Sequence, residues 1–191
     1  ELTLILGPSG SGKSTFLTIA GGLRWPSSGQ VLIDSQNIQD MNKHELERLR
    51  LNKIGFILQS YNLLPYLTVA EQFQLVDRVK PNGNLNREEL DQLMRELDIV
   101  QLKNQYPDQL SGGQNQRVAI ARALYTNPSL VLADEPTAAL DSERGAAVGQ
   151  EFQRLARQKN KTVIVVTHDL RLRKYADRIC EINDGKIKQT K

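Results

Sequence analysis

Hydrophobic residues along the chain follow two patterns, and each pattern predicts one kind of element. Short runs rich in leucine or β-branched residues and bounded by turn residues predict strands. They open the chain at 1–6 and recur at Gln30–Ile33, Ile54–Leu58, Leu130–Ala133, Thr162–Val166 and Ile179–Ile182. Amphipathic spacing predicts helices. These fall at Lys13–Ala20, Lys43–Leu51, Val69–Val79, Arg87–Leu97, Gly113–Leu124 and Ser142–Gln158.

The order of these elements predicts an α/β fold. Strands that are apolar on both faces and alternate with helices indicate a parallel sheet with helices on both sides. No strand is predicted between Ser60 and Thr126, so we expect one domain, with a core of 1–59 and 127–191 and an inserted helical subdomain at 60–126. The chain begins inside a strand and without methionine, so we also expect that an N-terminal piece is missing.

Composition narrows the class of protein. A chain of 191 residues with 39% apolar and 25% charged residues is typical of one globular domain. Its apolar runs are far shorter than the ~20 residues that cross a bilayer. We therefore expect no direct membrane insertion, and contact with a membrane only through a partner. The net charge of +3 points to no particular partner, and the single cysteine, Cys180, excludes an internal disulfide.

A phosphate-binding loop follows the first predicted strand. The string fits the pattern G-x-x-x-x-G-K-[ST] between a strand and a helix, and it consists of Gly7, Pro8, Ser9, Gly10, Ser11, Gly12, Lys13, Ser14 and Thr15. Glycines let the backbone N–H groups surround an anion, and the helix N-terminus adds a partial positive charge. Lys13 supplies a cation for the β- and γ-phosphates, and the Ser14 hydroxyl can ligate Mg²⁺.

Two carboxylates follow the apolar strand near residue 130. Asp134 ends this strand at the edge of the sheet where the phosphate loop also lies. We expect Asp134 to hold Mg²⁺ and Glu135 to act as the base for an attacking water.

A third motif distinguishes among phosphate-loop proteins. Leu110 is followed by Ser111, Gly112, Gly113 and Gln114, then by Asn-Gln-Arg-Val-Ala-Ile-Ala-Arg-Ala-Leu. Ser111 and Gly113 stand at the N-terminus of a predicted helix and offer a second anion site. With this string the sequence resembles the ATP-binding subunits of ABC transporters, whose signature is this pentapeptide. The resemblance covers essentially the whole chain and implies a P-loop NTPase with a RecA-like parallel sheet.

Further site residues are implied by the resemblance. Gln59 matches the glutamine that senses Mg²⁺ and the attacking water, Asp141 the loop that crosses to the other protomer, and His168 the switch histidine at the γ-phosphate. In the family, the signature of one protomer faces the ATP of the other. The resemblance thus implies a homodimer around two ATP molecules with Mg²⁺, and ATP hydrolysis. The family's adenine-stacking aromatic lies upstream of this chain, and Ala138 replaces a serine that many relatives carry.

The resemblance extends to a subgroup of transporters. The segment Asn62-Leu-Leu-Pro-Tyr-Leu-Thr-Val-Ala-Glu-Gln is similar to the macrolide-efflux and lipoprotein-release class, and Gly55-Phe-Ile-x-Gln-Ser to bacterial haem-efflux ATPases. This implies a peripheral subunit at the cytoplasmic face of a bacterial membrane. Its separate permease would dock near Tyr61–Val69. Haem is then the expected cargo, and peptide antibiotics, macrolides, lipids and lipoproteins stay open.

Two other function classes remain as alternatives. An ABC ATPase of DNA repair needs a long coiled-coil insertion before the signature, and one of translation needs two cassettes in one chain; neither feature is present. A non-hydrolysing regulatory module conflicts with the intact Glu135 and His168. We therefore expect no nucleic-acid partner.

Overall fold

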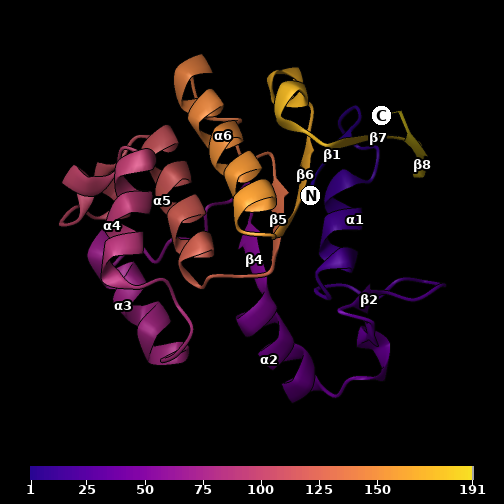
Figure 1. The fold of residues 1–191 in the computed structure, drawn as a ribbon, viewed down its shortest axis with the longest axis horizontal. Coiled ribbons are helices and arrows are strands. Elements are labelled where there is room, and N and C mark those ends of the chain that lie inside the picture. The colour runs from indigo at the N-terminus through magenta and orange to yellow at the C-terminus, as the bar shows by residue number, and fades with distance from the viewer. Residues whose placement is uncertain (191) are drawn as a thin grey trace.

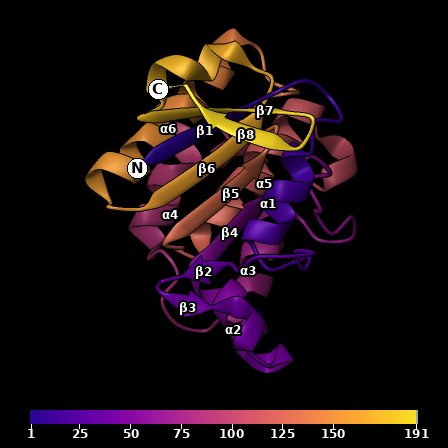
Figure 2. The ribbon, with the colours of Figure 1, turned by 90° about the vertical axis from the view of Figure 1, so that its right-hand side faces the viewer.

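A six-stranded sheet forms the centre of the fold in the order β4-β5-β6-β1-β7-β8 (Figure 2). The computed structural model describes residues 1–190. The strands are β1 (Leu2–Leu6), β4 (Ile54–Ile57), β5 (Leu130–Asp134), β6 (Thr162–Thr167), β7 (Arg178–Asn183) and β8 (Lys186–Gln189). The neighbours β4, β5, β6, β1 and β7 all pair in parallel, and β8 pairs antiparallel to β7. The predicted α/β fold with a mostly parallel sheet is confirmed.

Helices cover both faces of this sheet (Figures 1 and 2). They are α1 (Lys13–Ala20), α2 (Lys43–Lys53), α3 (Val69–Val79), α4 (Arg87–Glu96), α5 (Gly112–Tyr125) and α6 (Ser142–Gln158). Short 3-10 helices lie at η1 (Ile38–Asp40), η2 (Val100–Leu102), η3 (Pro107–Gln109) and η4 (Leu170–Tyr175). Within 60–126, the helices α3, α4 and α5 lie together at one end of the molecule (Figure 1).

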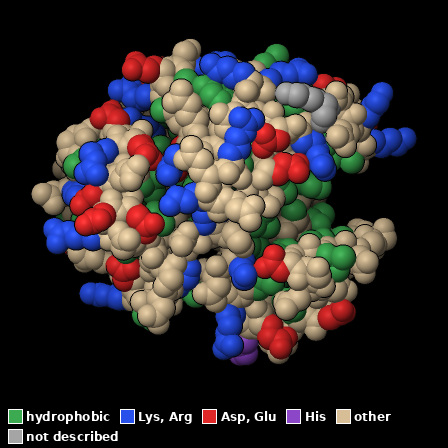
Figure 3. Space-filling view, viewed as in Figure 1, with side chains coloured by type: hydrophobic (Ala, Val, Ile, Leu, Met, Phe, Trp, Pro, Cys, Tyr) green, Lys and Arg blue, Asp and Glu red, His purple; other side chains and the backbone are tan. Residues whose placement is uncertain are grey.

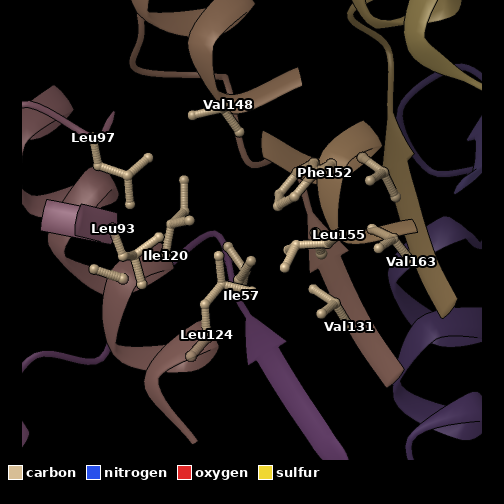
Figure 4. Close-up of a cluster of buried hydrophobic side chains, with 14 of the residues drawn as sticks. Ile57, Leu93, Leu97, Ile120, Leu124, Val131, Val148, Phe152, Leu155 and Val163 are labelled. Carbon is tan, nitrogen blue, oxygen red and sulfur yellow. The ribbon is translucent and has the colours of Figure 1, made fainter. Parts of the chain in front are cut away.

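Two buried clusters hold the layers together. The larger cluster joins α3 to α6 to one face of the sheet, and Figure 4 shows Ile120 of α5 and Phe152 of α6 within it. The smaller cluster includes Leu17 of α1 and Leu46 of α2. Strand β5 serves both, because Val131 belongs to the first cluster and Leu132 to the second. This alternation explains why the strands are apolar on both faces.

Capping boxes fix where four of the helices begin. Asn42, Thr68, Asn86 and Ser111 each accept a hydrogen bond from the backbone three residues on, and a Glu or Gln side chain there accepts one in return. This exchange pairs N–H groups that a helix N-terminus leaves without partners. The starts of α2, α3, α4 and α5 are thus set by local sequence.

Three short strands differ from the prediction. Gln30–Ile33 was expected to be a strand, but only Leu32–Ile33 is one (β2), and it pairs with β3 (Gln36–Asn37) in a separate two-stranded sheet. The residues between them, Asp34 and Ser35, have φ of 50° and 63°, which makes a tight hairpin turn rather than a crossover. Strands β3 and β8 were not predicted from the sequence, and a similar turn at Asp184 and Gly185 leads into β8.

Among residues 1–190, no helix combines the length and the apolar character needed to cross a bilayer. On the face shown in Figure 3, Lys and Arg side chains are interspersed with Asp and Glu.

Candidate active site

The loop at residues 7–12 connects β1 to the start of α1. Gly10 and Gly12 have φ of 79° and 100°, which is the left-handed region that favours glycine. A Cβ at either position would have no heavy atom of the described residues within 4 Å. The loop is therefore open on its concave side, and α1 points its N-terminal N–H groups at that space.

Gly7 is required for a different reason. A Cβ on Gly7 would lie 2.3 Å from the Ile182 carbonyl oxygen and 2.8 Å from Ser11 Oγ. The loop thus begins in close contact with β7, where the Ile182 backbone carbonyl cannot shift without moving the strand.

The Lys13 ammonium lies across the loop. Its Nζ donates to the carbonyl oxygens of Gly7 and Pro8, at 2.8 Å each, and the residue is buried. The cation is therefore held at the mouth of the loop, where an anion bound by the backbone would contact it.

One pocket unites the loop with residues from three other strand ends. Strands β1, β4, β5 and β6 all bring their carboxyl ends to this edge, as expected for a ligand site of a parallel sheet. The pocket is lined by Ser9, Gly10, Gly12, Lys13, Ser14, Thr15, Gln59, Asp134, Glu135, Ala138 and His168. The structure therefore brings together Lys13, Gln59, Glu135 and His168, which come from four separate stretches of the sequence.

Asp134 lies beside the first turn of α1. Burial raises the pKa of its carboxyl group, and the charge of Glu135 adds to this; the Ser14 hydrogen bond and the Lys13 charge oppose it. Two oxygen donors, a hydroxyl and a carboxylate, thus lie together next to a phosphate loop. This donor set fits a hard cation such as Mg²⁺.

Glu135 follows Asp134 with a left-handed backbone, φ 48°. Its Oε2 accepts a hydrogen bond of 2.6 Å from Thr167 Oγ1. Its Oε1 accepts one of 3.2 Å from the His168 backbone N–H and lies 2.9 Å from His168 Nδ1. The carboxylate is buried, whereas the His168 side chain is 72% exposed. Glutamate and histidine therefore form one unit at the pocket wall.

Polar residues that support this unit were missed by the sequence analysis. Thr137 Oγ1 donates to Asp169 Oδ2 at 2.7 Å, and the Asp169 backbone N–H donates to Thr167 Oγ1 at 3.0 Å. The Arg171 guanidinium and Thr137 lower the pKa of Asp169 to about 2. The only signal in the sequence was a run of polar residues at the end of an apolar strand.

The signature residues lie outside this pocket. Ser111 Oγ accepts from the Gln114 N–H at 3.2 Å and Gln114 Oε1 accepts from the Ser111 N–H at 2.7 Å, while Ser111 and Gly112 are exposed. Asp141 likewise caps α6, where it accepts from the Arg144 N–H at 2.9 Å. Ser111, Gly112, Gly113, Gln114 and Asp141 are thus separate from the phosphate loop of their own chain.

The fold and the pocket define a phosphate-loop nucleoside triphosphatase. A glycine loop at a helix N-terminus, a lysine over it, and an Asp-Glu pair at the carboxyl end of β5 are the parts that such ATPases use.

Comparison with known proteins gives the family. The family described as "ABC transporter" matches residues 1–138. "Dimeric Structure of MJ0796, a Bacterial ABC Transporter Cassette" has a TM-score of 0.90 and 42% identity, and covers 100% of this chain and 86% of that chain. A second structure of MJ0796, in a post-hydrolysis state bound to ADP and Pi, has a TM-score of 0.88. The chain belongs to the ABC transporter family and is an ATP-binding, ATP-hydrolysing subunit of a transporter.

Two similar proteins support the subgroup resemblance. "Putative hemin import ATP-binding protein HrtA" of Staphylococcus haemolyticus is 48% identical over 98% of this chain and 85% of the relative. "Lipoprotein-releasing system ATP-binding protein LolD 1" of Chlorobium chlorochromatii is 46% identical over 98% of this chain and 77% of the relative. The expected likeness to haem and lipoprotein-release ATPases is confirmed. The first name specifies import, whereas the sequence analysis expected efflux.

Proposed function

We propose that this chain is the ATPase subunit of a bacterial exporter, that it forms a homodimer around two ATP molecules, and that it drives a separate membrane permease with haem as cargo. The observation that carries the dimer is the separation of the signature from the phosphate loop. The N-terminus of α5 is exposed at Ser111 and Gly112, away from the chain's own pocket. A second copy placed head to tail would bring a signature to each pocket.

Within one chain, the pocket residues take distinct roles. The phosphate loop from Gly7 to Thr15 holds the phosphates, with Lys13 at the β- and γ-phosphates. Ser14, Gln59 and Asp134 would hold Mg²⁺, which would neutralise charge on the phosphate oxygens.

Hydrolysis needs a base and a sensor of the γ-phosphate. Glu135 is buried beside the pocket and takes a proton from the attacking water. His168, which is exposed and 2.9 Å from Glu135, contacts the γ-phosphate and reports its loss. The contact between the two residues supports a coupled response to the nucleotide.

The partner copy completes each site. The signature Ser111, Gly112, Gly113 and Gln114 would then meet the γ-phosphate of the opposite site, with Ser111 and Gly113 as the donors, since a helix N-terminus favours an anion. Asp141 caps the start of α6 and belongs to the loop that would cross to the partner copy. The dimeric MJ0796 structures support this arrangement.

A permease would dock on the helical subdomain. We assign 1–59 and 127–191 to the catalytic core and 60–126 to the subdomain that carries the signature. Tyr66, in the segment Tyr61–Val69, is 71% exposed, which supports a contact surface there. The subunit then lies at the cytoplasmic face of the membrane and is held there by the permease, without inserting itself and without a nucleic-acid partner.

The proposal of haem as cargo rests on similarity of sequence. The HrtA and LolD relatives are 48% and 46% identical, so identity alone separates haem from lipoprotein only slightly. The haem assignment is further supported by the Gly55-Phe-Ile-x-Gln-Ser string, which is similar to bacterial haem-efflux ATPases. Lipid, macrolide or peptide cargo is the second candidate, and the LolD relative supports it.

Growth in toxic haemin tests the cargo and the direction together. The source organism would carry wild-type protein, Lys13→Ala, or the control Lys43→Ala, whose side chain is 86% exposed on α2. Haem export predicts that only Lys13→Ala is sensitive to haemin. Equal growth of all three strains would exclude haem export, and improved growth of Lys13→Ala would indicate import.

A further inference from the structure

Gln116 is a buried amide that the site described above does not use. It lies on α5 with 2% of its surface exposed. Its Nε2 donates to the Glu135 carbonyl oxygen at 2.9 Å, and its Oε1 accepts from the Ala139 backbone N–H at 3.0 Å. One side chain therefore pairs a C=O and an N–H at the two ends of the loop that follows Glu135.

The backbone of Glu135 needs such support. Its φ of 48° is a left-handed conformation that costs free energy for a residue with a side chain. Strained residues at functional sites persist only where their surroundings fix them. The Glu135 N–H donates to the Val166 carbonyl at 2.9 Å, and the Ala138 N–H donates to the Glu135 carbonyl at 3.2 Å. The hydrogen bond from Gln116 adds a contact to the Glu135 carbonyl from α5, which lies outside this loop.

The chemistry of the contact is specific to an amide. The site requires one donor and one acceptor on the same planar group, and glutamine supplies both. An ionised carboxylate would keep the Ala139 bond but would face the Glu135 carbonyl with a second acceptor. Leucine would leave a buried C=O and a buried N–H without that partner.

The same helix carries the signature at its N-terminus. A Cβ on Gly113 would lie 3.0 Å from the Ala139 carbonyl oxygen, so α5 packs closely on the loop at that point too. The signature end of α5 and the backbone of Glu135 are thus fixed to each other within one chain.

We propose that Gln116 is a positioning residue for ATP hydrolysis, which sets the backbone of Glu135 and so aims its carboxylate at the attacking water. The inference rests on the proposed role of Glu135 as the base. Because the side-chain hydrogen bonds of Gln116 go to Glu135 and Ala139 rather than to the phosphate loop or the exposed signature residues, its loss should change the chemical step and leave ATP binding intact.

The test compares three variants of the full-length protein by steady-state ATP hydrolysis. Gln116→Leu should lower kcat by about 10- to 100-fold, the scale of a misplaced catalytic group, with an unchanged KM for ATP. Gln153→Leu is the matched control, because Gln153 Nε2 donates to the Tyr175 carbonyl at 3.1 Å, far along α6 from the pocket. It should keep the wild-type kcat even where its thermal stability falls as much as that of Gln116→Leu.

Gln116→Glu adds a readout that a purely structural role would not move. A protonated carboxyl group has the donor and acceptor of the amide, and burial favours that neutral form. The kcat of Gln116→Glu relative to wild type should therefore rise as the pH falls from 8 to 6. A flat ratio, or a Gln116→Leu kcat equal to that of Gln153→Leu, would overturn the inference.

A further variant separates this inference from the proposed function. Glu135→Gln should abolish hydrolysis if Glu135 is the base. If Glu135→Gln stays active, the proposed role of Glu135 is wrong. If it is inactive while Gln116→Leu behaves like the control, only the positioning role of Gln116 is wrong.

Discussion

At the scale of single residues, Gly7 shows how closely the phosphate loop is packed against the sheet. Its missing Cβ leaves room for the Ile182 carbonyl, which would otherwise lie 2.3 Å away. Gly7→Ala must push β1 and β7 apart, and overpacking of this kind costs about 1–3 kcal/mol of unfolding free energy. Urea denaturation measures this loss, and an unchanged midpoint would show that the two strands separate freely.

Asp169 makes the stability of the fold depend on pH. Its pKa is held at about 2, below the ordinary 3.8, chiefly by the Arg171 guanidinium. A lowered folded-state pKa stabilises the protein above the ordinary value, and the contribution is lost as the pH falls through about 2. Asp169→Asn should therefore lower the unfolding free energy most at neutral pH, with the difference from wild type shrinking below pH 4. Urea denaturation at several pH values measures it, and a difference independent of pH would contradict this account.

The residues of the pocket were largely predictable from sequence, whereas their supports were not. Lys13, Ser14, Asp134 and Glu135 stand in patterns whose chemistry is local, so strand and helix boundaries suffice to place them. Gln116 acts on residues that are distant in the sequence, and its neighbours give no sign of it. Only the three-dimensional structure shows that its amide reaches the loop after β5.

At the scale of elements, α5 holds two distant parts of the chain together. Besides Gln116, its Arg122 donates from Nη1 to the Asn62 carbonyl at 2.7 Å and from Nη2 to the Tyr61 carbonyl at 3.1 Å. Tyr61 and Asn62 have positive φ and lie two and three residues after Gln59. The helix thus links the segment after Gln59 to the loop after Glu135.

Loss of the arginine should release that segment. Arg122→Met removes the charge-assisted hydrogen bonds to the Tyr61 and Asn62 carbonyls and a longer one, 3.4 Å, to Gln72 Oε1, and should lower the unfolding free energy by about 1–3 kcal/mol. Amide hydrogen exchange at residues 60–64 should accelerate, while Arg78→Met, at an exposed position on α3, should change neither quantity. Equal exchange at 60–64 in both variants would show that other contacts hold the segment.

Elements with strong local signals were predictable, and those that depend on turns were not. Helices α2, α3 and α4 start at capping boxes, and α3 and α4 also carry amphipathic spacing, so the local sequence predicts where they begin. Strand β8 reads Lys-Ile-Lys-Gln and is exposed throughout, so it gives no hydrophobic signal. The Asp184-Gly185 turn was the available sign of that hairpin.

At the scale of the whole molecule, the proposed dimer gives each chain a part in two different sites. The phosphate loop, Glu135 and His168 line one pocket, and Ser111 opens α5 elsewhere on the surface. A pair of chains related by two-fold symmetry would place each signature over the other chain's pocket and form two equal sites. ATP binding would then close the pair, and hydrolysis would reopen it.

The most direct measurement is the mass in solution of full-length Glu135→Gln protein with excess ATP and Mg²⁺, by light scattering after gel filtration. The variant should bind ATP without hydrolysing it, and should elute at twice the monomer mass. Adding Ser111→Arg should return it to a monomer that still binds ATP, because Ser111 is exposed outside the chain's own pocket. A Glu135→Gln protein that stays monomeric while saturated with ATP would contradict the composite site.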